Sequence, residues 1–117
     1  MNQINEIIDV KKASCRTMNL DELMYVLKSQ RNVFWSWGPH GFRVDKQNNV
    51  TMFRMNVNGH HHKGHVYIFL NALDLFDVYL TTTQGTIKDR TDEMGVYNDM
   101  LVDWIDEKIE RIPEYKR

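Results

Sequence analysis

The sequence of 117 residues contains one cysteine, two prolines and no apolar run long enough to cross a membrane. A single cysteine, Cys15, cannot form a disulfide within the chain, so nothing in the sequence points to an oxidising compartment. Residues 1–12 carry Glu6 and Asp9 and no apolar stretch, which is not typical of a signal peptide. We therefore expect a cytoplasmic protein that does not associate with a membrane.

Internal repeats, low-complexity tracts and Pro/Gly-rich linkers are also missing from the sequence. At this length, with 42% hydrophobic residues, we expect one domain with one core over residues 1–117, with residues 1–18 as a loosely attached N-terminal helix in one interpretation. No Gly-rich phosphate loop, Gly-x-Ser-x-Gly or His-Glu-x-x-His motif occurs. We therefore predict a protein that is not an enzyme and that holds no cofactor.

The formal net charge is −1, which by itself does not predict binding to a polyanion. The charges are unevenly distributed along the chain. Residues 1–63 carry nine Lys/Arg and five Asp/Glu, whereas residues 64–117 carry six and eleven. Such an asymmetry is typical of an interaction surface, but the two faces of one small domain also produce it.

Three helices are predicted from capping and from the spacing of apolar residues. Residues 3–13 form a short helix with three isoleucines on one face. Asn19 is placed to cap a second helix, and Glu22 completes a capping-box pattern before an apolar stripe in residues 20–27. The last helix has an apolar stripe at three- and four-residue spacing, namely Tyr97, Met100, Leu101, Trp104, Ile105, Ile109 and Ile112.

Alternating apolar and polar residues predict strands, because successive side chains of a strand point to opposite faces. The predicted strands are residues 33–38, 42–44, 50–57, 66–70 and 75–83. Residues 66–70, "VYIFL", are apolar on both faces, so we expect this strand to be central and covered on both sides. The order helix, helix, antiparallel meander, helix predicts an α+β domain with two layers, in which a meander of about four to five strands packs against two or three helices.

The Asn58-Gly59 pair predicts a two-residue hairpin turn, since both central residues of a type I′ turn need positive φ. The turn also sets the register of the two strands that it joins. The resulting pairs are Val57 with His60, Met55 with His62 and Phe53 with Gly64.

Histidines near this turn raise the question of a metal site. In the predicted register, His60 and His62 share a face about 6.6 Å apart along the strand, where two imidazoles can share an ion. A zinc site needs three or four converging ligands, and no third ligand is evident in the sequence. Metal binding by His60 and His62 is therefore a minor alternative to imidazoles that are exposed at a hairpin tip.

An aromatic and basic surface is a second candidate site. Proteins that bind single-stranded nucleic acids stack bases on exposed aromatic rings beside Lys and Arg. Trp35 and Trp37, on one face of a predicted strand, would form such a surface together with Arg43, Arg54 and Lys63. The alternative is that the two tryptophans form the apolar layer beneath a helix.

A third candidate site is a line of carboxylates on the last predicted helix. Asp99, Asp103, Asp106 and Glu110 recur at spacings of four, three and four residues, opposite the apolar stripe. Such a line could dock on a basic surface of a partner protein. The alternative is a solvated helix face that Lys108 partly neutralises.

The segments "FWSWGPHGF", "MFRMNVNGHHHKGHVYIFLNALDLFDVYLTT" and "VYNDMLVDWIDEKIE" occur in this order over roughly residues 30–110. In this layout the chain resembles small proteins of unassigned function that are carried by phages and other mobile elements of bacteria. The resemblance implies no catalytic or ligand-binding residue. It implies only that the protein binds a host or viral macromolecule.

Taken together, the sequence predicts a non-enzymatic protein–protein interaction module of phage or mobile-element origin with an unidentified protein partner. The runner-up is a single-stranded nucleic-acid-binding protein that uses the aromatic and basic surface. A homodimer, through an edge strand or an exposed aromatic patch, is left open.

Overall fold

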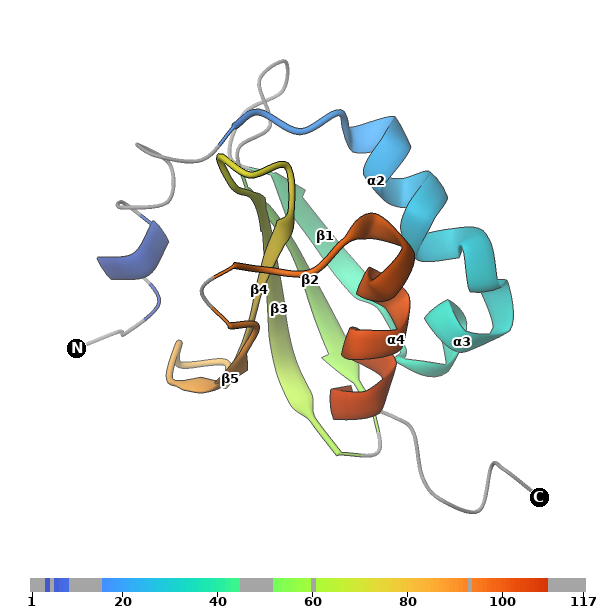
Figure 1. Ribbon diagram of the computed structural model, residues 1–117. Helices are drawn as coiled ribbons and strands as arrows, with labels where there is room; N and C mark the ends of the chain where they lie inside the picture. Colours follow the sequence, from blue (N-terminus) through green and yellow to red (C-terminus); the bar gives the residue numbers. More distant parts are fainter. Residues whose placement is uncertain are drawn as a thin grey trace.

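Five strands in chain order form one antiparallel sheet, β1-β2-β3-β4-β5, in the computed structural model of the protein (Figure 1). The structure describes residues 4, 6–8, 16–44, 52–59, 61–92 and 94–109. The strands are β1 (His40–Val44), β2 (Phe53–Asn58), β3 (Lys63–Leu70), β4 (Phe76–Thr81) and β5 (Ile87–Arg90). The helices are α2 (Leu20–Leu27), the short 3₁₀ helix η1 (Lys28–Gln30), α3 (Arg31–Ser36) and α4 (Asn98–Ile109).

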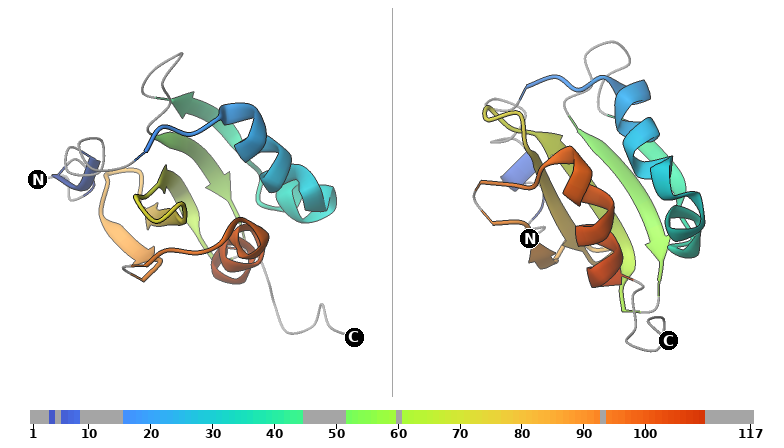
Figure 2. Two further views of the ribbon diagram at one scale, coloured as in Figure 1. Left: turned by 45° about the horizontal axis from the view of Figure 1, so that its top comes forward. Right: turned by 45° about the vertical axis from the view of Figure 1, so that its right-hand side comes forward.

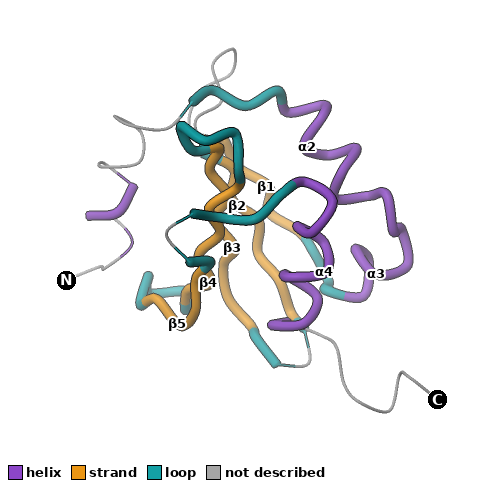
Figure 3. Tube along the Cα trace, viewed as in Figure 1, coloured by secondary structure: helices purple, strands orange, loops and turns teal. Residues whose placement is uncertain are grey.

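The helices α2, α3 and α4 cover one face of this sheet (Figure 3). Leu23, Phe34 and Ile105, one from each helix, belong to the same buried cluster as Met55 and Val66 of the sheet. Figure 2 shows α2 and α4 side by side above the strands. The predicted α+β class, a meander packed against two or three helices in a single domain, is therefore confirmed.

The start of α2 follows the capping signal in the sequence. The side chain of Asn19 accepts a hydrogen bond from the backbone N–H of Glu22 at 3.1 Å, which satisfies one of the N–H groups that a helix start leaves without a partner. Leu23 and Leu27 are buried, as their spacing predicts. The cap thus positions the first turn of α2 at the edge of the core.

Residues 33–36 belong to the helix α3, and Trp37 and Gly38 form the turn that follows it, so the strand prediction for residues 33–38 was wrong. Phe34 and Trp37 are three residues apart and therefore lie on one side of a helical turn, where both are buried in the core. Their ring centroids are 5.6 Å apart. Trp35 points away and is 51% exposed. A short apolar run fits the period of a strand and that of a helix equally well, and the core selected the helix.

The β2–β3 connection is longer than the predicted two-residue turn. Asn58 pairs with Lys63 and Val57 with Gly64, so the predicted pairing of Val57 with His60 was wrong. Gly59 does not have positive φ. Glycine is needed there because a Cβ would overlap the side chain of Ile109 at the end of α4.

The longer loop shifts the register by four residues but leaves the faces of the strands unchanged. Val57 pairs with Gly64 and Met55 with Val66. Side chains alternate with a period of two, so an even shift keeps every residue on its predicted face. His60 lies outside the described residues.

The second face of β3 is covered as well, as predicted for the central strand. Tyr67 and Phe69 pack with Tyr79 and with Ile4, which is fully buried. Figure 1 shows the helical residues near the N-terminus on the side of the sheet opposite α4. Most of the helix predicted over residues 3–13 lies outside the described residues.

Candidate functional site

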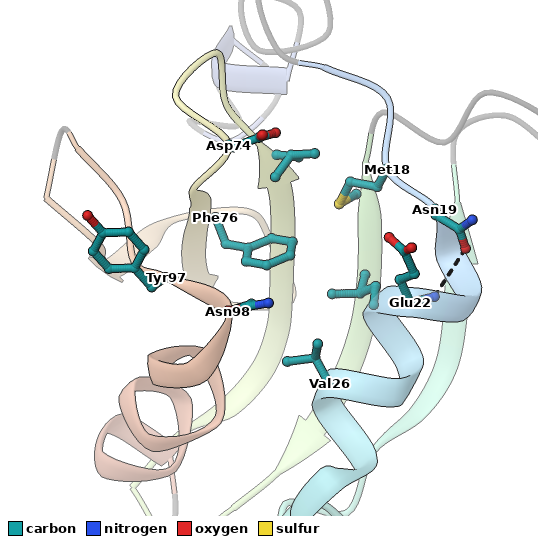
Figure 4. Close-up of a pocket in the computed structure, with 10 residues that line it drawn as sticks. Met18, Asn19, Glu22, Val26, Asp74, Phe76, Tyr97 and Asn98 are labelled. Atoms are coloured by element: carbon teal, nitrogen blue, oxygen red, sulfur yellow. Dashed lines mark hydrogen bonds between the residues drawn. The ribbon is translucent and has the colours of Figure 1, made fainter.

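A groove opens between the N-terminal ends of α2 and α4 on the helical side of the sheet (Figure 4). Its volume is about 340 Å³. The lining residues are Met18, Asn19, Glu22, Leu23, Val26, Leu70, Asp74, Phe76, Tyr97 and Asn98. They come from α2, β3, the β3–β4 turn, β4, α4 and the segments that precede α2 and α4, so only the folded chain brings them together.

The floor of the groove is apolar. Met18, Leu23 and Phe76 are buried members of the main core, and Leu70 packs against them. Figure 4 shows the ring of Phe76 between the start of α4 and α2. Because these side chains are held by the core, the floor exists before any ligand arrives.

The rim of the groove is acidic. Glu22 is in the first turn of α2, and Asp74 is in the turn between β3 and β4. Asp74 has a φ of 65°, a conformation that Asp tolerates better than most residues. It forms an ion pair with Arg16 at 2.8 Å, so a guanidinium group is already bound at this rim.

Asn71 determines the shape of the turn that carries Asp74. Its Oδ1 accepts hydrogen bonds from the backbone N–H groups of Leu73 and Leu75, and its carbonyl oxygen accepts one from the N–H of Asp74. Its Nδ2 donates to Oδ1 of Asp77 at 3.1 Å. Buried Asn71 thereby ties the turn to β4 and holds the carboxylate of Asp74 at the groove.

A second hollow of about 480 Å³ continues the groove along α2. The two hollows share Glu22, Val26 and Asn98, and the second adds Asp21 and Tyr25. We call the two together the acidic groove, because their linings contain the carboxylates of Asp21, Glu22 and Asp74 and no Lys or Arg. Large aromatic side chains stand at its edges, since Tyr25 is 79% and Tyr97 64% exposed.

The acidic line that was predicted on the last helix is interrupted in the structure. Asp99 and Asp103 are exposed on α4, and Oδ1 of Asp103 accepts a hydrogen bond from Nε2 of Gln30 at 3.5 Å. Asp106 is only 5% exposed and accepts a hydrogen bond from Nε1 of Trp37 at 3.0 Å. The prediction that Asp106 lies on a solvated face was therefore wrong, because α3 packs against that side of α4. Glu110 lies outside the described residues.

The two tryptophans do not share a face with the predicted basic residues. Trp37 is buried on the helical side of the sheet and Trp35 is exposed on α3. Arg43 and Arg54 form a cross-strand pair on the opposite face. Lys63 is on that opposite face too, because it pairs with Asn58 in the same register. The basic half of this predicted site is therefore assembled, but without its tryptophans.

The histidines form no metal cluster within the described part of the chain. No group of three or more His, Cys, Asp or Glu side chains is placed there to hold an ion. His62 is in the β2–β3 loop instead of a strand, and its predicted partner His60 is outside the described residues.

Two histidines of this hairpin have pKa values below the usual range. Burial is the largest cause of the lowered pKa of His62. Burial is also the largest cause for His65, whose pKa is lowered further by the positive charge of Arg54. Both imidazoles therefore resist protonation in the folded protein more than in the unfolded chain.

We expect the free energy of unfolding to decrease as the pH falls from about 7.5 to about 5.5. Below the ordinary His pKa of about 6.5, the unfolded chain takes up protons that folded His62 and His65 do not yet accept, which favours unfolding. Urea unfolding at both pH values measures the decrease. A His62→Gln, His65→Gln variant should lose part of it, whereas His40→Gln is the matched control. An equal decrease in the double variant would contradict the assignment.

Sequence reasoning missed the acidic groove. Glu22 was identified only as a capping residue, and Tyr97 only as part of an apolar stripe. Only Asp74, in "NALD", could have been identified as an exposed carboxylate from the sequence, since an Asp at a turn between two strands is exposed and tolerates positive φ. Nothing in the spacing of these residues indicates that they meet.

Comparisons with other proteins add no family to this description. No helix among the described residues combines the length and the apolar character that a membrane span requires. No family model, no curated protein and no solved structure matches the chain. The function of the protein is therefore proposed from its surfaces and its sequence.

Proposed function

We propose that the protein is a non-enzymatic protein–protein interaction module that binds a basic segment of a partner protein in the acidic groove. The observation that carries the proposal is the combination of a preformed apolar floor with a rim of carboxylates and no Lys or Arg in the lining. Such a site favours a segment that has an apolar anchor beside Lys or Arg.

The size of the groove fits side chains of a segment better than a whole folded surface. The two hollows have volumes of about 340 and 480 Å³, enough for a few side chains. Burial of one aliphatic or aromatic anchor on the floor would contribute about 1.5–3 kcal/mol. The exposed rings of Tyr25 and Tyr97 would add contact area, as aromatic residues commonly do at interfaces.

The ion pair between Arg16 and Asp74 supports a basic ligand. It is solvent-exposed, and such pairs contribute little stability, so a cationic side chain of the partner can replace Arg16 at small cost. We also propose, from the sequence pattern, that the protein is of phage or mobile-element origin and that its partner is a host or viral macromolecule in the cytoplasm.

The test is a selection of peptides from a random display library on the immobilised protein. We expect the selected peptides to carry Lys or Arg next to an aromatic or aliphatic residue. For these peptides, a Glu22→Gln, Asp74→Asn variant should bind about tenfold more weakly, because it removes two rim charges without changing their shape. Fluorescence anisotropy with labelled peptides measures the affinities.

The matched control is a Glu107→Gln, Asp103→Asn variant, which removes two charges of α4 outside the groove. Its affinity for the selected peptides should stay within about twofold of the wild type. Selected peptides without basic residues, or equal losses in the two variants, would rule out the acidic groove as the binding site.

A further inference from the structure

The face of the sheet opposite the helices has a hollow of its own at one end of β1, β2 and β3. Its volume is about 340 Å³, and it is separate from the acidic groove. The lining residues are His40, Asn56, Val57, Asn58, Lys63, Gly64, His65 and Thr83. No carboxylate lines it.

Strand pairing brings the basic residues of this hollow together. His40 pairs with Asn56, and Asn56 pairs with His65, so one row across three strands presents two imidazoles. Lys63 is one row further along this face and Arg54 is one row back, each about 7 Å from the central row.

These positive charges have no negative partner in the part of the chain that the structure describes. Arg43 and Arg54 are directly opposite one another on β1 and β2, an arrangement that destabilises a sheet. Neither of them, nor Lys63, forms an ion pair with a described carboxylate. The charges of Arg54 and Arg43 also contribute, after burial, to the lowered pKa of His65, so the cations affect one another.

Three buried polar atoms in or near the hollow have no hydrogen-bond partner among the described residues. Oδ1 of Asn56, an acceptor, belongs to a lining residue, Nε of Arg54, a donor, is one row away, and Nε2 of His62 is in the loop before β3. Buried polar groups are nearly always hydrogen-bonded in folded proteins. A ligand with a negative charge and a neighbouring hydrogen-bond donor would satisfy this surface.

We propose that this hollow binds a nucleotide unit, with its phosphate between His40, Lys63 and His65. Arg43 and Arg54 supply positive potential from the adjoining row, and a hydroxyl or amino group of the nucleotide donates to Oδ1 of Asn56. This chemistry fits a free mononucleotide and a single-stranded nucleic acid alike. The site is on the face opposite the acidic groove, so it does not depend on the peptide-binding function.

The test is fluorescence anisotropy at low salt with labelled single-stranded DNA and RNA of about twelve nucleotides. We expect both to bind, and an Arg43→Gln, Lys63→Gln variant to bind at least about tenfold more weakly with a shallower salt dependence. The matched control is Lys28→Gln, Arg31→Gln, which removes two exposed positive charges on the helical side. Its affinity should stay within about twofold of the wild type.

Competition identifies the ligand class. A mononucleotide and the unlabelled strand are compared as competitors at equal phosphate concentration. If the mononucleotide displaces the labelled strand as well as the unlabelled strand does, the site takes single nucleotides. If only the strand competes, the site takes nucleic acid. Either result supports the proposal.

Inorganic phosphate or a phosphoserine peptide competing as well as the nucleotides would overturn the assignment to a nucleotide. Equal losses in the two variants, or no binding of strand or mononucleotide at low salt, would overturn the site itself. Selected peptides should bind the Arg43→Gln, Lys63→Gln variant normally.

Discussion

Replacing Trp37 with alanine is expected to lower the free energy of unfolding by about 3–5 kcal/mol, a large fraction of the stability of a domain of this size. Trp37 is fully buried and packs edge-on against Phe34. Its Nε1 donates to Asp106, and its carbonyl oxygen accepts the N–H of Asn58 at 2.8 Å. The residue therefore joins α3, α4 and the end of β2, and its loss leaves a cavity where these elements meet.

Trp35→Ala is the matched control, because it makes the same chemical change two residues away. Trp35 is 51% exposed, with Lys28 near its ring, so we expect a loss of about 1 kcal/mol or less. Urea unfolding followed by circular dichroism measures both variants. Similar losses for the two would mean that Trp37 is not the buried member of the pair.

Replacing Gly64 with alanine is expected to destabilise the protein by about 2–3 kcal/mol, the second largest effect. Gly64 has a φ of 154°, and a Cβ there would overlap the carbonyl oxygen of Thr81 on β4. Backbone in the centre of a sheet cannot move aside without breaking ladder hydrogen bonds. The substitution therefore pushes the start of β3 away from the end of β4.

Gly38→Ala distinguishes this overlap from backbone strain. Gly38 has a φ of 62°, but a Cβ at this position would have its nearest neighbour at 3.5 Å. The expected loss is therefore only the cost of a left-handed alanine, about 1–2 kcal/mol. Urea unfolding of the two variants under the same conditions makes the comparison. A smaller loss for Gly64→Ala than for Gly38→Ala would contradict the close approach of β3 and β4.

The two proposed binding surfaces are on opposite sides of the sheet and have opposite charge. We call the hollow on the sheet together with the adjoining Arg43 and Arg54 the basic face. The uneven charge of the two halves of the chain does not map simply onto the two surfaces, because Glu22 of the acidic groove and Arg54 of the basic face both come from residues 1–63. Strand and helix packing, and not sequence position, separates the charges. The two surfaces can therefore be tested independently by the paired variants described above.

Local signals predicted part of the fold correctly. Asn19 caps α2, because the cap depends only on residues within one turn. The alternation in residues 53–57 placed Phe53, Met55 and Val57 on the core face. That placement is correct although the turn differs from the predicted one, because the register differs from the prediction by an even number of residues.

The errors occurred where contacts between distant segments override local preference. Residues 33–38 alternate like a strand, yet they form the end of α3 and the turn after it, where Phe34 and Trp37 are buried in the same cluster as residues of α4. Asp106 has the spacing of a solvated stripe, yet Trp37 provides a buried donor 69 positions away in the chain. Gly59 follows Asn58 as in a tight turn, yet it contacts Ile109.

The sequence by itself determined the class of fold and the faces of β2, β3 and β4, because hydrophobic period and helix capping act over a few neighbouring residues. Only the tertiary structure decided where the acidic groove and the basic face are formed. Each surface combines side chains from three or more elements, and their meeting depends on packing free energies that no local pattern encodes.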